Sequence, residues 1–299
     1  MLNFTLLKLS DIDLISPYFE YSKTRACDNT IGGTFMWRDY FKTEYAITGD
    51  TLFFKVKYLN GETAFSAPLC PCGRGCEKAA GFIFDYCAEK GIPAVICMAA
   101  EEDRDILENK FVISSVPEPN WSDYMYNASD LADMAGKRYS GQRNHIHAFM
   151  RDNPDYQFEE IGKRNIREIS EFFLNYERRG DKTSLLYLTE REKVFEVFNN
   201  WDMYRQSGIV LRAGMQIVGF AIGEIIGDTL FVHIEKANAE CRGAYQMLVK
   251  QFAVMAVEKG AVYINREDDA GDEGLRISKL SYHPCEMVNK YTVTLLEKK

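Results

Sequence analysis

The sequence predicts an α/β chain of the mixed α+β kind, made of two tandem domains that each contain a mostly antiparallel sheet. Three observations predict this fold class. Two segments with the pattern of a long amphipathic helix followed by a short strand resemble each other, each follows strands joined by tight turns, and a basic segment lies between the halves. The predicted ranges are 1–127 and 156–299 for the domains, joined by a basic linker helix at 128–155.

The first half supplies these elements in order. A hairpin is predicted in "EYAITGDTLFFKVKY", where Gly49 and Asp50 form the turn, and "TAFSAPL" adds a strand. The stretch "GRGCEKAAGFIFDYCAEKGIPAVIC", from Gly73 to Cys97, has the apolar period of a helix and then becomes β-rich. Gly91 stands where the C-cap of that helix is expected.

A basic connector follows the first half. Ser129 or Asp130 can cap a helix there that ends before Pro154. No acid lies between Asp133 and Asp152. The residues of this connector that share one helical face are Arg143, His147 and Arg151, and those expected to pack inward are Tyr139, Ile146 and Phe149 or Met150.

Two interpretations of the connector remain open. A charged face can simply be solvated, or it can bind the phosphate of an anionic donor. The candidate anion-binding residues are Lys137, Arg138, Arg143, Asn144 and His147, with Arg242 and Gly243 from the second half.

The second half repeats the first. Strands are predicted in "IVLRAGMQIVGFAIGEIIGDTLFVHIEKA", with turns at Ala213-Gly214 and Gly227-Asp228. The stretch "CRGAYQMLVKQFAVMAVEKGAVYIN" then matches the first long helix and its strand, and Gly260 is the expected C-cap. Its apolar helical face consists of Tyr245, Leu248, Val249, Phe252, Met255 and Ala256.

Composition restricts the class of protein. The 299 residues suffice for two ordinary domains, and a hydrophobic content of 46% excludes disorder. The net charge of −8 disfavours a generalised nucleic-acid surface, although a local basic patch is compatible with it. No uncharged run approaches the roughly 20 residues of a membrane helix, and the N-terminus lacks the basic start of a signal peptide. We therefore expect a cytoplasmic protein without an integral membrane segment.

The eight cysteines are expected to be free thiols, because no secretory signal accompanies them. Cys70, Cys72 and Cys76 in "CPCGRGC" could begin a zinc site, but no fourth ligand follows at zinc spacing. His145 and His147 could join them only through folding. Small buried residues around a glycine turn explain the motif, so no metal is expected.

Four stretches carry a resemblance to a known family. They are "GGTFMWRDYF" (Gly32 to Phe41), "GKRYSGQRNHIHAF" (Gly136 to Phe149), "HIEKANAECRGAYQ" (His233 to Gln246) and the stretch from Asn265 to Pro284. With them the chain resembles the C-terminal catalytic domain of phosphatidylglycerol lysyltransferases, which is related in fold to the Fem-type peptidoglycan aminoacyltransferases. The resemblance implies two tandem GNAT-like domains of the acyl-CoA N-acyltransferase-like fold.

The resemblance also implies an activity. Members of that family transfer an aminoacyl group from charged tRNA to a lipid, without a metal or organic cofactor. The lysyltransferases carry an N-terminal membrane domain that is not seen in this sequence, so the lipid acceptor is less well supported than the reaction class. The expected acceptor is therefore an amine or hydroxyl of a lipid head group, a peptide or a small molecule, and the expected donor is aminoacyl-tRNA.

Strand alternation gathers candidate catalytic groups. In "DTLFVHIEKA" it places His233 and Glu235 on one face, and in "YINREDD" it places Asn265 beside Glu267. His233 or Glu235 can take or relay a proton, and Asn265 can donate to a carbonyl. The alternative is a satisfied polar pair at the end of a strand.

The acids that follow suggest a substrate site. Carboxylates in this stretch offer counter-charges to a cationic amino acid, and Arg276 and Lys279 on the following helix could hold the donor's phosphate or terminal adenosine. Ordinary surface ion pairs are the alternative. The candidate substrate-binding residues are Glu267, Asp268, Asp269, Glu273, Arg276, Lys279 and Tyr282.

Two other functions remain open. A CoA-dependent N-acetyltransferase needs a Gln/Arg-x-x-Gly-x-Gly/Ala loop, and neither "CGRGC" nor "ANAECRGAYQM" contains the full pattern. A non-catalytic duplicate of the fold that binds tRNA or a peptide is the other. It is favoured if His233, Glu235 and Asn265 are buried and satisfied by one another.

Overall fold

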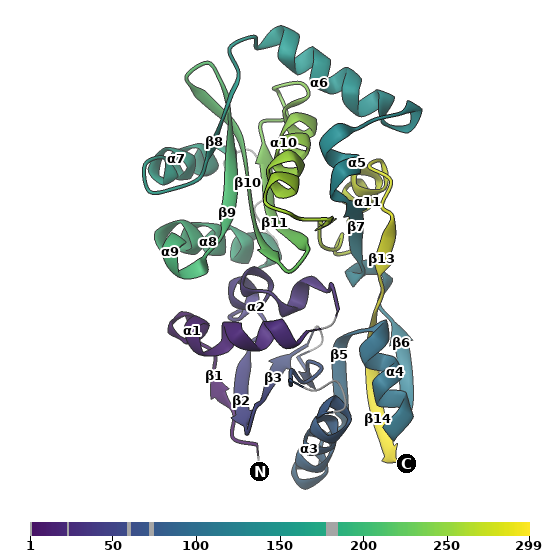
Figure 1. Ribbon diagram of the computed structural model, residues 1–299. Helices are drawn as coiled ribbons and strands as arrows, with labels where there is room; N and C mark the ends of the chain where they lie inside the picture. Colours follow the sequence, from purple (N-terminus) through teal and green to yellow (C-terminus); the bar gives the residue numbers. More distant parts are fainter. Residues whose placement is uncertain (1, 23, 59–60, 72–74, 178–184) are drawn as a thin grey trace. The chain divides into compact units, whose positions relative to one another are not determined.

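The computed structural model describes residues 2–22, 24–58, 61–71, 75–177 and 185–299. The chain forms two compact units. The first consists of Met1–Asp123, Asp268–Gly271 and Met287–Lys299, and the second of Tyr124–Glu267 and Asp272–Glu286. In the described part of the chain each unit is built on one seven-stranded sheet, with helices beside it (Figure 1). The predicted mixed fold class with two mostly antiparallel sheets is confirmed.

The first sheet has the strand order β1-β2-β3-β4-β5-β14-β6. Its described pairs are antiparallel except for β4 and β5, which run parallel. The predicted hairpin joins β2 to β3 through Gly49, which adopts a φ of +62°. The bounds are β1 Thr5–Leu6, β2 Glu44–Thr48, β3 Thr51–Lys57, β4 Thr63–Phe65, β5 Ala94–Ala100, β6 Phe111–Pro117 and β14 Lys290–Lys298.

A hydrophobic core joins the long helix α3 to this sheet. Ile83 of α3 packs with Phe65 and Ile96 from the strands, and all three are fully buried. Gly91 follows the helix with a φ of +64°, as predicted for its C-cap. The helices of this unit are α1 Ile12–Ile15, α2 Ile31–Trp37, α3 Gly75–Lys90 and α4 Glu101–Lys110, with 3-10 turns η1 Leu9–Asp11, η2 Ser16–Tyr21, η3 Cys27–Asn29 and η4 Pro119–Trp121.

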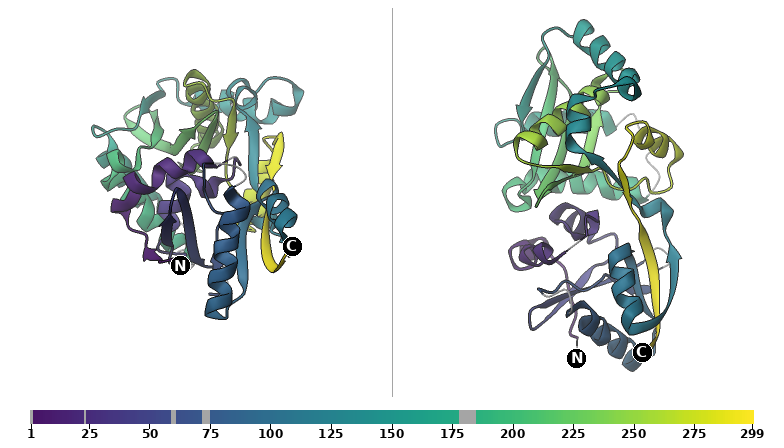
Figure 2. Two further views of the ribbon diagram at one scale, coloured as in Figure 1. Left: turned by 60° about the horizontal axis from the view of Figure 1, so that its bottom comes forward. Right: turned by 45° about the vertical axis from the view of Figure 1, so that its right-hand side comes forward.

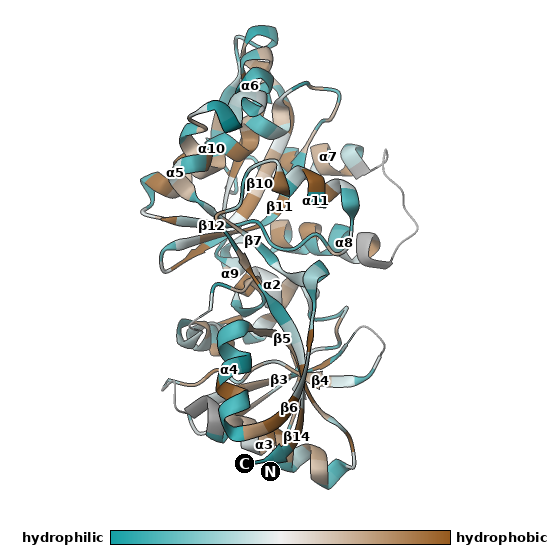
Figure 3. Ribbon diagram, turned by 90° about the vertical axis from the view of Figure 1, so that its right-hand side faces the viewer, coloured by the Kyte–Doolittle hydropathy of each residue, from teal (hydrophilic) through white to brown (hydrophobic). Residues whose placement is uncertain are grey.

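The second sheet has the strand order β13-β7-β12-β11-β10-β9-β8. Strands β8 to β11 form an antiparallel run, and β12 is parallel to β11 and antiparallel to β7. Brown, hydrophobic stretches mark β10 and β11 in Figure 3. The bounds are β7 Asp123–Asn127, β8 Gln157–Glu160, β9 Ser207–Ala213, β10 Gln216–Ile226, β11 Thr229–Ala237, β12 Tyr263–Asn265 and β13 Glu286–Val288.

Helices cover both faces of the second sheet. Figures 1 and 3 show α7 and α8 on one side, and α5 and α10 on the other. The predicted apolar face of α10 is buried, apart from half-buried Tyr245. The helices are α5 Ala128–Asp133, α6 Ser140–Asp152, α7 Ile166–Glu177, α8 Leu185–Asn199, α9 Trp201–Tyr204, α10 Ala244–Glu258 and α11 Glu273–Leu280, with the 3-10 turn η5 Lys137–Tyr139.

The repeated segment appears in both units. In each, the strand after the long helix pairs in parallel with the strand before it, β5 with β4 and β12 with β11. The following glycines, Gly91 and Gly260, both adopt positive φ. The similarity of the two sequence segments therefore corresponds to the same strand–helix–strand unit.

The units do not follow the predicted ranges 1–127, 128–155 and 156–299. Strand β14 inserts between β5 and β6, so residues 287–299 belong to the first unit (Figure 2, right, yellow). Residues 128–155 lie within the second unit. The physical reason is that a strand joins whichever sheet satisfies its backbone N–H and C=O groups, and closeness in sequence does not specify that partner.

The connector is not one helix capped by Ser129 or Asp130. Met134 is left-handed with a φ of +50° and ends α5, Gly136 has a φ of +80°, and α6 begins only at Ser140. The predicted end before Pro154 holds, since α6 stops at Asp152. Tyr139, Ile146 and Phe149 are buried as predicted, whereas Met150 is exposed.

Candidate functional site

A buried histidine bridges two carboxylates in the second unit. His233 lies on β11, and its side chain is 2% exposed. Its Nδ1 is 2.7 Å from Oε1 of Glu267, and its Nε2 is 2.8 Å from Oε1 of Glu224 on β10. Gln206 donates from Nε2 to the same Glu224 oxygen at 3.3 Å. These residues form a connected polar cluster in the second unit.

A local irregularity between β10 and β11 accommodates this cluster. The register shifts between Ile222 and Gly223, so that Ile222 faces Ile234, Gly223 faces Val232, and His233 has no opposite partner. A Cβ on Gly223 would lie 2.2 Å from the carbonyl oxygen of Phe231, so only glycine fits there. Bulges of this kind commonly redirect a side chain next to a functional site.

The two carboxylates keep His233 charged. Burial by itself would lower its pKa, but the hydrogen bonds to Glu224 and Glu267 outweigh burial and raise the pKa to about 10. At neutral pH both ring nitrogens therefore carry protons and donate to the carboxylates. An imidazolium cannot accept a proton, so this geometry argues against the general-base role predicted for His233.

Glu267 adopts a strained backbone. Its φ is +57°, a conformation that a residue with a side chain rarely takes. Buried Asn265 accepts the Glu267 N–H on its Oδ1 at 2.6 Å. The predicted donation from Asn265 to a carbonyl stays a prediction. The Glu267 side chain remains 21% exposed. In the His233–Glu267 pair, the carboxylate of Glu267 is accessible to solvent and the imidazole of His233 is buried.

Glu235 is neutralised by an arginine. Arg266 donates to Oε2 of Glu235 from Nη2 at 2.6 Å and from Nε at 3.1 Å. The guanidinium stacks over the Tyr282 ring, 4.8 Å from its centroid. Burial opposes the charge of Arg266, but Glu235 raises its pKa above the ordinary value. The Glu235 carboxylate, which the sequence offered as a group that takes or relays a proton, is therefore paired with a buried guanidinium.

The rest of the acidic stretch shapes a turn. Asp268 and Asp269 accept the N–H groups of Ala270 and Gly271 on their side chains, at 2.9 Å in both cases. Asp269 is 1% exposed, and residues Asp268–Gly271 belong to the first unit. These two acids are therefore not brought together with Glu267 in one unit.

The predicted substrate-binding residues on and after helix α11 differ in burial and in their contacts. Asp272 caps it by accepting the Leu275 N–H at 2.7 Å. Lys279 is buried and donates from Nζ to the carbonyl of Arg266 at 2.6 Å, so it supports the cluster and does not lie at a rim. Glu273 is exposed and Arg276 is half-buried. Tyr282 is buried, and burial raises its pKa to about 12.

The predicted anion-binding residues have separate roles. Arg143 donates from Nη1 to the carbonyls of Met134 and Gly136, which closes the end of α5, and Arg138 pairs with Asp130 at 2.9 Å. Among the described residues, no hydrogen bond or ion pair links these predicted residues to the His233 cluster. The exposed members are Lys137, Arg138, Asn144, His147 and Arg242.

Gly243 is needed for packing. It has a φ of +83°, and a Cβ there would lie 2.1 Å from the carbonyl oxygen of His145. The start of α10 therefore approaches α6 as closely as backbone permits.

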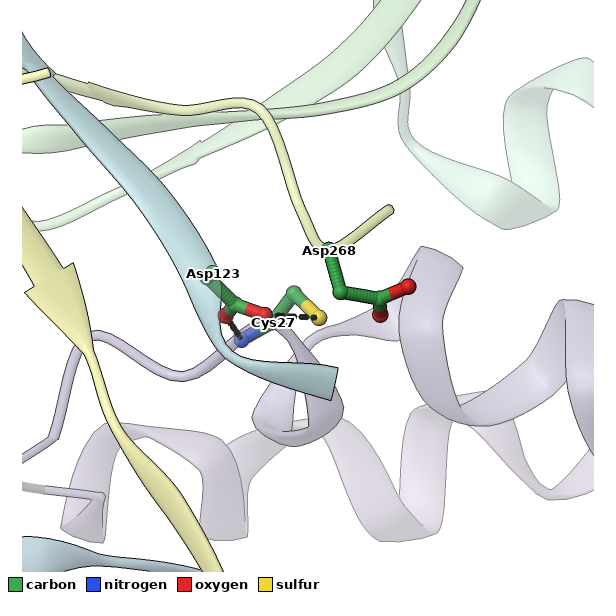
Figure 4. Close-up of side chains that lie close together, drawn as sticks. All are labelled: Cys27, Asp123 and Asp268. Atoms are coloured by element: carbon green, nitrogen blue, oxygen red, sulfur yellow. Dashed lines mark hydrogen bonds between the residues drawn. The ribbon is translucent and has the colours of Figure 1, made fainter. Parts of the chain in front are cut away.

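A second polar cluster lies in the first unit. Possible ligand atoms of Cys27, Asp123 and Asp268 lie within 4.8 Å of one another, and Cys27 donates to Asp123 from N and Sγ (Figure 4). The buried ammonium of Lys290 is 2.6 Å from Asp123, 2.7 Å from Asp28 and 3.4 Å from the Cys27 sulfur. The chain thus supplies its own cation here.

The side chain of Lys290 is protonated although it is buried. Burial would lower its pKa, but Asp123 and Asp28 raise it well above the ordinary value. A metal ion would have to displace this ammonium. The cysteine motif is only partly visible: Cys70 is buried, Cys72 lies outside the described residues, and the side chain of Cys76 is not described. The absence of a metal there stays a prediction.

The sequence did not single out several residues that contact these clusters: Glu224, Gln206, Arg266, Cys27, Asp28, Asp123 and Lys290. Glu224 is an acid inside the apolar run "GFAIGEII", and Lys290 precedes the apolar run "YTVTLL". A charge at a strand position that must be buried needs a partner. That signal was available, but it does not identify the partner.

No helix in the described ranges is both long and apolar enough to cross a bilayer. A family model described as "Phosphatidylglycerol lysyltransferase, C-terminal" matches residues 19–294. An uncharacterized protein of Mycoplasmoides gallisepticum is 22% identical over 195 residues. That match covers 64% of this chain and 61% of the relative, which is less than two thirds of its length.

Solved structures share the fold. A conserved protein of unknown function from Bacteroides thetaiotaomicron is 28% identical, with a TM-score of 0.88 over 99% of this chain and 100% of the other. L-PGS from Bacillus licheniformis is 14% identical, with a TM-score of 0.66 over 95% and 91% of the two chains. FemX has a TM-score of 0.61 at 9% identity, over 98% and 97%. The predicted resemblance to both groups is confirmed at the level of fold.

Proposed function

Because the chain belongs to the family of phosphatidylglycerol lysyltransferase C-terminal domains, we propose that it is an aminoacyltransferase. It takes an aminoacyl group from aminoacyl-tRNA and transfers it to an amine or hydroxyl of a lipid head group, a peptide or a small molecule. The observation that carries this proposal is the family match, which extends over residues 19–294 and so includes both units.

Glu267 is the residue that we assign to the aminoacyl group. Its carboxylate is partly exposed, and its backbone is held in the left-handed region by Asn265. The imidazolium of His233 donates to this carboxylate and holds it in place. Every aminoacyl ester carries an α-ammonium, and a fixed carboxylate can bind it through charge-assisted hydrogen bonds.

The reaction itself needs no protein nucleophile. The acceptor's lone pair forms a bond to the ester carbonyl carbon, and the bond from that carbon to the ribose oxygen then breaks. The acceptor's proton goes to the released ribose oxygen. Because His233 already holds both of its protons, it positions the Glu267 carboxylate and does not deprotonate the acceptor.

The test uses the purified chain with tRNA charged by radiolabelled amino acids. Phosphatidylglycerol vesicles, amine-bearing peptides and a small-molecule extract serve as separate acceptors, and labelled acetyl-CoA serves as the competing donor. We expect label to leave tRNA for one acceptor class in a protein-dependent manner. Transfer from acetyl-CoA alone would overturn the proposal in favour of an N-acetyltransferase.

Glu267→Gln tests the assigned residue. A charge-assisted hydrogen bond contributes about 1.5–3 kcal/mol, so transfer should fall roughly ten- to a hundredfold. Glu258→Gln removes an equal charge from an exposed position on α10 and should change nothing. Equal activity of the two variants would remove Glu267 from the site.

One observation favours a second candidate function. His233, Glu235 and Asn265 have side chains that are buried or nearly so and hydrogen-bonded, although to other residues and not to one another. This meets part of the condition for a non-catalytic duplicate that binds tRNA or a peptide. The two functions differ in a single-turnover experiment. A binding protein retains the aminoacyl ester intact, whereas a transferase consumes it when acceptor is added.

A further inference from the structure

Arg266 contains a buried donor that the protein does not use. The residue is 8% exposed, its Nη2 and Nε bind Glu235, and its Nη1 is buried with no hydrogen-bond partner among the described residues. In Arg212 on β9, by contrast, every guanidinium nitrogen has an acceptor. Its Nε, Nη1 and Nη2 donate to Glu159 or Glu168 at 2.6 Å. A buried guanidinium N–H without an acceptor is costly, so an unpaired one requires an explanation.

The guanidinium is rigidly held. Two nitrogens bind one carboxylate oxygen of Glu235, and the ring of Tyr282 lies below the group. The Cζ atom of Arg266 is also 5.8 Å from the centroid of the Tyr126 ring. The backbone carbonyl oxygen of Arg266 accepts from Nζ of Lys279, which fixes the backbone as well. The free N–H is thus preorganised, which is the property that a stabilising group in a reaction requires.

Arg266 and Glu267 are neighbours in the chain, and both bond to side chains of β11. Glu267 bonds to His233, and Arg266 bonds to Glu235. The pairing of β10 and β11 skips His233, and Glu267 has a left-handed φ, so regular strand alternation does not describe this region.

We propose that Arg266 is a catalytic residue whose Nη1–H donates to the carbonyl oxygen of the aminoacyl ester, while Glu267 holds its ammonium. This inference rests on the proposed function. As the acceptor's bond to the carbonyl carbon forms, the carbonyl electron pair moves onto that oxygen, and Arg266 stabilises the resulting oxyanion. When the pair returns, the bond to the ribose oxygen breaks and that oxygen takes the acceptor's proton. Glu235 and Tyr282 are positioning residues for the guanidinium.

The experiment compares Arg266→Lys with Arg212→Lys. Both substitutions keep a positive charge beside the carboxylate partner, but only the first removes an unused N–H. Loss of one oxyanion donor typically costs about a hundredfold or more in kcat. We expect that loss in Arg266→Lys with little change in KM and a melting temperature close to that of Arg212→Lys. Equal kcat in the two variants would overturn the inference.

A measurement on the unaltered protein covers the case in which Arg266→Lys does not fold. The probe is the amide analogue 3′-alanylamino-3′-deoxyadenosine, titrated into protein with ¹⁵N-labelled arginine. We expect the side-chain resonances of Arg266 to shift and those of Arg212 to stay. Binding of the probe without a shift at Arg266 would refute its role.

The two proposals fail in different ways. If the unaltered protein neither transfers an aminoacyl group nor binds the probe, the proposed function is wrong and the assignment of Arg266 falls with it. If the protein transfers the group and Arg266→Lys transfers it equally fast, the function stands and only the role of Arg266 is wrong.

Discussion

The charge of His233 is determined by residues that are distant from it in sequence. Strand alternation predicts that His233 and Glu235 share one face of β11, but the pairing of β10 and β11 shifts at His233 and interrupts that period. Strand alternation does not reveal Glu224, which reaches the ring across the irregular pairing of β10 and β11. Residue type alone suggests that His233 or Glu235 takes or relays a proton, whereas the structure shows both ring nitrogens of His233 hydrogen-bonded to carboxylates.

This charge predicts how stability depends on pH. The folded pKa of His233 is about 10, against roughly 6.5 in an unfolded chain. The protonated ring stabilises the fold fully below about pH 6.5, and this contribution is lost as the pH rises through 10. Within the described residues, the charged groups bonded to the ring are Glu224 of β10 and Glu267 after β12. We expect the second unit to unfold at lower urea concentration as the pH rises from 6.5 to 10.

Glu224→Gln is the control for this dependence. It removes one carboxylate from the ring, so the pKa of His233 should fall and the loss of stability should begin at lower pH. The ring proton shifts of the four histidines report the charge directly. If His233 titrated at the same pH in both proteins, the bridging carboxylate would not be the cause.

The structure also changes what is expected of Glu267→Gln. From the sequence alone, the choice was between an unpaired site carboxylate and a surface pair with Arg276. Its partner is instead a buried imidazolium, which Glu224 still compensates in the variant. The substitution should therefore cost about 1–3 kcal/mol of stability in addition to its effect on transfer.

At the scale of elements, the apolar period of the sequence predicts where the long helices lie better than it predicts where helices end. Helices α3 and α10 and their C-cap glycines follow from apolar spacing and from the need for positive φ. The break between α5 and α6 does not, because it depends on Met134 in the left-handed region, where a methionine is uncommon. Packing of this buried side chain outweighs local preference.

Gly243 provides a test of how α10 is seated. Gly243→Ala must relieve a Cβ that would lie 2.1 Å from the His145 carbonyl, in addition to the strain of its φ of +83°. Gly227→Ala has a φ of +58° and nothing within 4 Å, so it suffers only the backbone strain of about 1–2 kcal/mol. We expect Gly243→Ala to be the more destabilising of the two by urea unfolding. Equal losses would mean that α6 can yield to α10 without cost.

At the scale of the whole molecule, the sequence repeat does not predict that the C-terminal strand returns to the first sheet. Two similar segments suggest two contiguous halves, and the predicted domains followed from that. Strand β14 nevertheless pairs with β5 and β6, about 190 residues earlier in the chain. Backbone pairing of this kind leaves no local trace, because an apolar strand near the end of the chain satisfies either sheet equally well.

Lys290, the first residue of β14, makes this return of the chain testable. Its ammonium is 1% exposed and compensates Asp123, which is fully buried in the same unit. Lys290→Met keeps much of the side-chain volume but leaves Asp123 without its cation, which typically costs about 3–5 kcal/mol. Lys298→Met, on the same strand, removes an ammonium that pairs with exposed Asp85 and lies over the Phe84 ring, and it should cost less than about 1 kcal/mol.

The measurement is hydrogen exchange of the two sheets, because a change in one unit need not appear in the other. In Lys290→Met the amides of β5 and β14 should lose protection while those of β10 and β11 keep it. Adding Asp123→Asn removes the stranded charge, so the double variant should regain part of the protection that Lys290→Met lost. If Lys290→Met resembled Lys298→Met, or if the second substitution made matters worse, the ammonium would not be what holds the C-terminal strand in the first unit.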